Sequence, residues 1–212
     1  MQVRAIEILP MRQAEIDLLI VNNPGYNFGL IGFAIAEANR SPKSKWLKSQ
    51  AATAGLDPVE VFKSAFDSAM RENGYALHWS EPVMEGDNSA TRRDSSGMRK
   101  SYTVSTHDAQ LGVNFGFIGY AAAGSGDSAP YRLTAVLSAR LLSADGRRVL
   151  FEDQIIYNSV FPGRPKAITL NPDSRYRYPD FDDLEAAGAT AVEGLPYAFT
   201  AVAQELARQL KP

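Results

Sequence analysis

The stretch of sequence that decides the fold is residues 131–141, which read YRLTAVLSARL. Apolar side chains alternate there with Arg132, Thr134, Ser138 and Arg140. Because successive side chains of a strand point to opposite faces of a sheet, this period of two predicts a strand with one face on a core and the other toward water. Such patterning is typical of antiparallel sheets.

The same pattern continues on both sides of this strand. Residues 109–117 alternate in the same way upstream. Downstream, Asp145-Gly146 is a strong signal for a type I′ hairpin turn, and residues 148–157 then resume an apolar strand. We therefore predict a run of antiparallel strands in the middle of the chain.

Four segments of the amino-terminal half are also predicted to form helices or strands. Residues 3–9 and 16–21 predict strands, and the second is expected to be buried on both faces because its apolar run is continuous. Residues 28–38 predict a short buried helix whose glycines permit close packing. Residues 75–84 predict another strand.

Two longer segments predict helices. Residues 57–74 begin with Asp57 as the N-cap, carry apolar residues at every third or fourth position, and end at a glycine. Residues 184–210 keep nearly one apolar face. Pro196 removes a backbone hydrogen-bond donor there, so we expect a kink or two consecutive helices.

The composition is that of a globular protein. The chain has 212 residues, 45% of them apolar and 22% charged, with a formal net charge of −2 and no cysteine. The order of the segments predicts an α+β fold: a mixed, mostly antiparallel sheet with helices packed on one face and a carboxyl-terminal helix, in a single domain over residues 1–212. The balanced charge argues against nucleic acid as a partner. The missing cysteine excludes disulfides, thiolate metal sites and cysteine nucleophiles.

The sequence contains no recognisable catalytic motif. Its two histidines, His78 and His107, do not stand in a metal-binding spacing, and no serine lies in a GxSxG turn. We therefore expect structural or surface roles for both histidines. We also expect no catalytic residue, no metal and no cofactor, so the chain is predicted not to be an enzyme.

The loop over residues 161–181 carries the best candidates for a recognition surface. Tyr176, Arg177 and Tyr178 are of the residue types that anchor protein interfaces most often, and Arg164 lies in the same loop. Alternatively, the aromatic side chains only tie this loop to the body of the domain.

Several of these features together carry a family resemblance. They are Gly29-Leu30-Ile31-Gly32, the capped helix that ends at Gly74, the strands joined at Asp145-Gly146, and the run from Tyr176 to Leu184. This layout resembles the uncharacterised periplasmic or outer-membrane lipoproteins of Gram-negative bacteria. It is also similar to the α/β domains of envelope accessory lipoproteins, such as the amino-terminal domain of the Tol-system periplasmic protein and the curli-secretion lipoprotein.

The resemblance implies a non-catalytic cell-envelope (lipo)protein that acts as an interaction or assembly module. Its partners would be other envelope proteins or peptidoglycan-associated machinery. It would be periplasmic and held at the outer membrane by a lipid anchor on a removed leader. The missing cysteine fits this location, because an oxidising periplasm cross-links free thiols. The first residues have no features of a leader, so a cytoplasmic protein is the alternative.

A second hypothesis belongs to another class of function. The protein would be a small-molecule binding protein or an unrecognised enzyme that uses a cleft between the sheet and the loops at residues 85–100 and 161–181. This hypothesis predicts a deep pocket with converging polar groups.

Overall fold

The computed structural model of the chain describes residues 3–11, 15–21, 42–81, 92–123, 130–158 and 167–211. Its elements, in chain order, are β1 (Ala5–Ile8), β2 (Asp17–Val21), α2 (Pro42–Thr53), α3 (Pro58–Glu72), β3 (Ala76–Trp79), β4 (Ala109–Ala123), β5 (Tyr131–Ser143), β6 (Val149–Tyr157), β7 (Ile168–Leu170), the short 3-10 helix η1 (Ser174–Tyr176), β8 (Arg177–Tyr178), α4 (Phe181–Ala187) and α5 (Ala189–Gln209). They form an α+β fold, which confirms the predicted class. The helix predicted over residues 28–38 lies outside the described residues.

The described strands belong to one mixed sheet of eight strands in the order β3-β1-β4-β5-β6-β7, with β2 also paired to β4 and β8 to β5. Its longest pairings, β4 with β5 and β5 with β6, are antiparallel, as the alternating pattern predicts. By contrast, β1 runs parallel to both β3 and β4. The sheet is therefore mixed and mostly antiparallel.

The strands β1 and β2 lie one after the other along the same edge of β4. Ile6 of β1 lies opposite Ala109 near the start of β4, and Leu19 of β2 lies opposite Ala121 near its end. Leu18 joins the main core, whereas its neighbour Leu19 joins a smaller apolar cluster. Since neighbouring side chains of a strand point to opposite faces, β2 is buried on both faces, as predicted.

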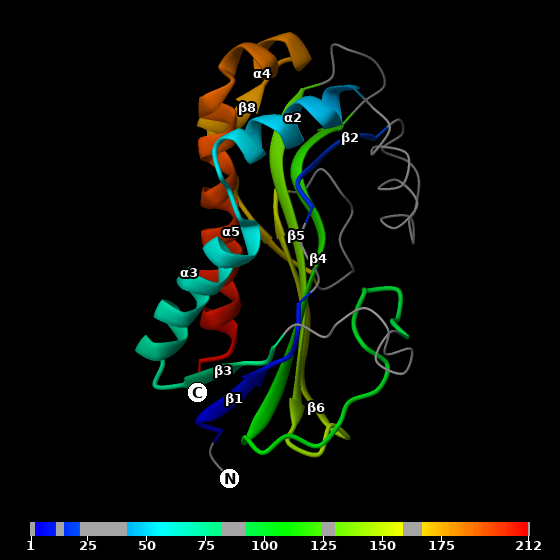
Figure 1. Cartoon of the computed structure of the whole chain (residues 1–212), viewed down its shortest axis with the longest axis vertical. Helices are drawn as coiled ribbons and strands as arrows, with labels where there is room; N and C mark the ends of the chain where they lie inside the picture. The colour runs from blue at the N-terminus through cyan, green and yellow to red at the C-terminus, as the bar shows by residue number, and fades with distance from the viewer. Residues whose placement is uncertain are drawn as a thin grey trace.

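Helices cover one face of the sheet, with α3 and α5 side by side and α2 near β2 (Figure 1). Helix α3 starts where the sequence predicts, because the Asp57 side chain accepts hydrogen bonds from the backbone N–H groups of Val59 (2.9 Å) and Glu60 (3.2 Å). Its buried residues, Phe62 and Phe66 among them, face the core together with the buried face of α5.

A segment without helices or strands, residues 92–108, packs on the opposite face of the sheet. Arg140 of β5 holds it there: its guanidinium donates hydrogen bonds to Asp94 Oδ2 (2.7 Å) and to the carbonyl oxygen of Arg99 (3.1 Å). The same guanidinium pairs in two places with Glu152, which lies opposite Arg140 on β6 (3.0 and 2.9 Å). One face of the sheet is therefore covered by apolar packing of helices, whereas on the other face this segment is held by hydrogen bonds and ion pairs.

The hairpin at Asp145-Gly146 is confirmed, but the predicted turn type is wrong. A type I′ turn needs positive φ at both central residues. The backbone N–H of Gly146 donates instead to the Ser143 carbonyl, which makes Ala144 and Asp145 the central residues. Gly146 alone in this turn has a positive φ, of 69°.

The carboxyl-terminal segment forms two consecutive helices, as expected, but the break is not at Pro196. It lies at Gly188, whose φ of 46° is a conformation that favours glycine and ends α4. Pro196 lies within α5, where it removes one hydrogen-bond donor without ending the helix.

Candidate functional site

Three of the four predicted recognition residues lie in the described part of the chain. Tyr176 and Tyr178 are only 7% and 8% exposed, whereas Arg177 between them is exposed. Arg164 lies outside the described residues. The structure therefore places two aromatic side chains inward and one guanidinium outward on the short pieces η1 and β8.

The two buried tyrosines tie their segment to the sheet and to α5. The ring of Tyr178 meets Tyr120 of β4 edge-on, at 5.6 Å between ring centres. The Tyr120 hydroxyl donates to the Ala191 carbonyl oxygen (2.9 Å), and burial raises the pKa of Tyr120. The Tyr176 ring packs on Gly194 of α5, where a Cβ atom would stand 2.6 Å from the ring. These contacts fit the packing alternative, and a binding role for Tyr176, Arg177 and Tyr178 stays a prediction.

An exposed pair beside Tyr176 has the features of a binding surface. The Arg175 guanidinium lies 5.4 Å from the ring centres of both Tyr176 and Tyr197. The Arg175 guanidinium also donates a hydrogen bond to Asp173 (2.7 Å), and this bond holds the pKa of Asp173 below its ordinary value. Tyr197 on α5 is 52% exposed. We call Arg175 and Tyr197 the Arg-Tyr surface.

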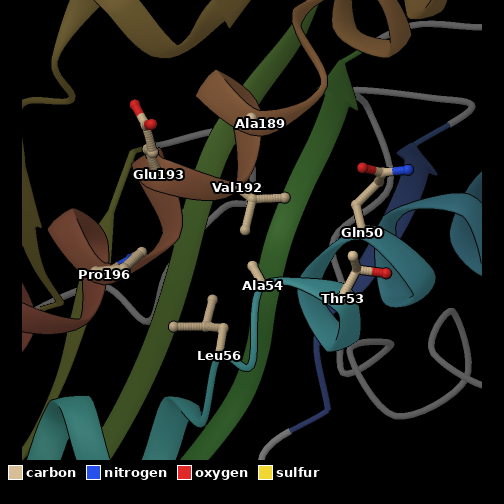
Figure 2. A pocket seen from close by; sticks show the side chains of 8 residues that line it. All are labelled: Gln50, Thr53, Ala54, Leu56, Ala189, Val192, Glu193 and Pro196. Carbon is tan, nitrogen blue, oxygen red and sulfur yellow. The ribbon is translucent and has the colours of Figure 1, made fainter.

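Two shallow grooves accompany this surface along α5. One, of about 420 Å³, lies between the end of α2 and the start of α5, and in Figure 2 the side chains of Ala54, Leu56 and Val192 gather around it. The other, of about 390 Å³, is lined by Glu193, Pro196, Tyr197, Thr200, Ala201 and Gln204. Since Glu193 and Pro196 line both, the grooves are neighbours and the second includes Tyr197.

These grooves are not the cleft that the small-molecule hypothesis expects. They lie along α5, on the helix side of the sheet. Parts of the two loops named in that hypothesis, residues 85–91 and 161–166, lie outside the described residues. The small-molecule hypothesis therefore stays a prediction.

The fold also brings the two histidines together. The rings of His78 and His107 stack at 4.1 Å between their centres. Glu7 of β1 lies opposite His78 in the sheet and accepts a hydrogen bond from the Ser80 hydroxyl (2.8 Å). Burial raises the pKa of Glu7, but hydrogen bonds from Ser105 and Ser80 outweigh it and hold this pKa below its ordinary value.

Sequence reasoning missed both the Arg-Tyr surface and the histidine stack. Arg175 and Tyr197 belong to different elements, and only the packing of η1 on α5 joins them. His78 and His107 meet because β3 and β4 both pair with β1. Parallel pairings between distant segments leave no local signal in a sequence, so no pattern could have found this stack.

Within the described residues, no group of three or more His, Cys, Asp or Glu side chains is arranged to hold a metal ion. None of the helices in the described ranges is both long and apolar enough to cross a bilayer.

The structure has a distant likeness to a solved structure. No family model and no curated protein matches the chain. The structure is similar to the crystal structure of a Xanthomonas campestris protein of the family DUF330, with 12% sequence identity and a TM-score of 0.39. The match covers 98% of this chain and 83% of that one.

Proposed function

We propose that the protein is a non-catalytic interaction module of the cell envelope, and that it binds a partner protein through the Arg-Tyr surface. The observation that carries the proposal is the fixed position of the Arg175 guanidinium between Tyr176, Tyr197 and Asp173. Tyrosine and arginine supply a large share of the binding energy at protein interfaces.

Preorganisation explains why this surface suits binding. A free arginine loses side-chain freedom when a partner immobilises it, which costs about 0.5–1.5 kcal/mol. Arg175 is already held by Asp173 and by two rings, although its side chain is 62% exposed. A partner can therefore contact it, bury the exposed part of Tyr197 and enter the adjacent groove at a lower entropic cost.

The envelope location is part of the same proposal. The absence of cysteine from the sequence supports an oxidising compartment, and a lipid tether on the amino side would hold the protein at the outer membrane. Other envelope proteins or peptidoglycan-associated machinery are then the partners to test. The cytoplasm is the alternative location. Fractionation of cells that express the full gene would distinguish the two locations.

A matched pair of variants tests the binding surface. Arg175→Ala combined with Tyr197→Ala should reduce the capture of envelope partners at least tenfold, because it removes both anchors. Arg71→Ala removes another exposed arginine, on α3, and should leave capture unchanged. Circular dichroism would confirm that each variant folds. Equal capture by the wild type and the double variant would reject the Arg-Tyr surface as the binding site.

A further inference from the structure

The ends of four strands meet at one end of the molecule. Ile6 near the start of β1 lies opposite Ala109, the first residue of β4, and Ala109 lies opposite Ser143, the last residue of β5. The Ser143 N–H donates to the Arg148 carbonyl just before β6 begins. The amino end of the chain therefore lies at the same end as the β5–β6 hairpin (Figure 1).

Exposed apolar side chains gather at this end. Within the described ranges, the large exposed apolar residues are Val104 (77% exposed), Val149 (50%), Leu150 (39%) and Tyr197. Tyr197 belongs to α5, but the other three lie by the hairpin. The backbone N–H of Ser105, next to Val104, donates to the Ala144 carbonyl in the hairpin turn (2.8 Å). Solitary exposed apolar residues are ordinary, whereas a group of them at one end marks a contact site.

The same end carries two exposed positive charges. Arg147 and Arg148 are exposed, and their guanidinium groups make no hydrogen bond or ion pair with the part of the chain that the structure describes. Asp145 of the turn accepts hydrogen bonds from the Ser143 hydroxyl and the Arg147 N–H. Asp108 accepts from the backbone at the start of β1. Both carboxylates thus accept hydrogen bonds from the protein's own donors. The nearby charges of Arg147 and Arg148 also help to lower the pKa of Asp145. Neither guanidinium forms an ion pair with that carboxylate in the described part of the chain, so both can still contact an external anion.

We propose that Val104, Arg147, Arg148, Val149 and Leu150, which we call the hairpin tip, contact a bilayer surface that contains anionic phospholipids. Arginine pairs well with phosphate groups, and exposed apolar side chains gain free energy by entering the boundary between headgroups and acyl chains. This inference goes beyond the protein-binding role. It needs no tether, although a lipid on the amino side would attach the protein at this same end.

Vesicle sedimentation with the full chain tests the hairpin tip. The wild type should bind vesicles of phosphatidylcholine and phosphatidylglycerol at least about fivefold more strongly than vesicles of phosphatidylcholine alone. Arg147→Gln combined with Arg148→Gln should weaken binding to the anionic vesicles about tenfold or more, because each arginine near such a surface contributes about fivefold. Val149→Ser combined with Leu150→Ser should also weaken it. Tyr197→Ser is the matched control and should bind as the wild type does.

Three results would overturn the proposal. The first is a wild type without preference for anionic vesicles, and the second is an arginine double variant that binds as well as the wild type. The third is a concentration-dependent dimer in analytical ultracentrifugation that the Val149 and Leu150 changes abolish, since the tip would then bind a second copy. If the apolar variant fails to fold, the variant in which the two exposed arginines are replaced by Gln still decides the question. Failure of this test leaves the Arg-Tyr surface untouched, because that surface is tested by protein capture.

Discussion

The two faces of the sheet are covered in different ways, and the difference separates two sources of stability. On one face, α3 and α5 bury rings such as Phe62 and Phe199, both without exposure. On the other face, the irregular segment 92–108 is held by polar contacts with Arg140, together with hydrogen bonds from Gln110 and Asn114 and the buried side chain of Met98. Apolar burial stabilises in proportion to area and is not directional, whereas a hydrogen-bonded ion network depends on each partner. We therefore expect the first face to determine global stability and the second to determine local order.

The largest effect should come from the helix-covered face. Phe199 of α5 is fully buried and meets Phe115 of β4 edge-on at 6.1 Å. Replacing Phe199 by Ala leaves a cavity and should lower the free energy of unfolding by about 3–5 kcal/mol. Urea denaturation measures this loss, and Phe199→Leu, which keeps more of the volume, should cost clearly less. Similar losses for both variants would mean that this position is not close-packed.

The next effect should come from the polar face. Replacing Arg140 by Met removes all the hydrogen bonds and ion pairs of its guanidinium, including those to the carboxylates of Asp94 and Glu152. We therefore expect the free energy of unfolding to fall by about 2–3 kcal/mol. Hydrogen exchange should accelerate in residues 92–105 and change little in α3 and α5. Arg71→Met, on the exposed side of α3, is the control. A uniform acceleration across the protein would show that the two faces are not separable.

A third effect should appear in acid. Burial raises the pKa of Asp94, but hydrogen bonds from Ser96 and Arg140 outweigh it and lower this pKa from 3.8 to about 2. A carboxyl group whose pKa is lowered by folding stabilises the folded state at pH values above its ordinary pKa. This contribution is lost as the pH falls through about 2. Because the side chain is 27% exposed, we expect a loss of about 1–2 kcal/mol between pH 4 and pH 2. Urea denaturation at successive pH values should show a smaller drop for Asp94→Asn, and an identical drop would contradict the assignment.

The smallest effect should come from the cap of α3. Asp57→Ala removes the acceptor for two backbone N–H groups and should cost about 1 kcal/mol in thermal or urea unfolding. Asp57→Ser keeps an acceptor and should restore most of the loss. A loss as large as that of the Arg140 variant would place the cap among the main determinants of the helix-covered face.

How much the sequence could predict depends on how far apart in the chain the interacting residues lie. The cap at Asp57 and the strand over residues 131–141 are local, and the structure confirms both. The prediction that one face of this strand meets water is wrong, because Thr134 and Ser138 on that face are buried. Gly188 rather than Pro196 ends a helix, because proline tolerance depends on what surrounds the missing donor. The sequence did not reveal that Arg140 joins an irregular segment to β6, since such contacts are visible only after the strands are paired.

The binding candidates show the same limit. Tyr176 and Tyr178 were predicted from residue type, yet their rings lie inside the fold. Arg175 and Tyr197 carry the exposed surface, and their meeting depends on how η1 packs on α5. Residue type thus pointed to this part of the chain, while burial decides which of its side chains reach solvent.

The position of β1 also has a consequence for how the chain acquires its structure. Both partners of β1 come much later in the sequence: β3 begins at Ala76, and β4 begins at Ala109. A ribosome that synthesises this chain must release more than half of it before the first strand can be fully paired, whereas α3 and the β4–β5–β6 hairpins close over short distances. Long loop closures of this kind slow folding. We therefore expect the nascent β1 strand to stay unpaired, and accessible to chaperones, until the middle of the chain emerges.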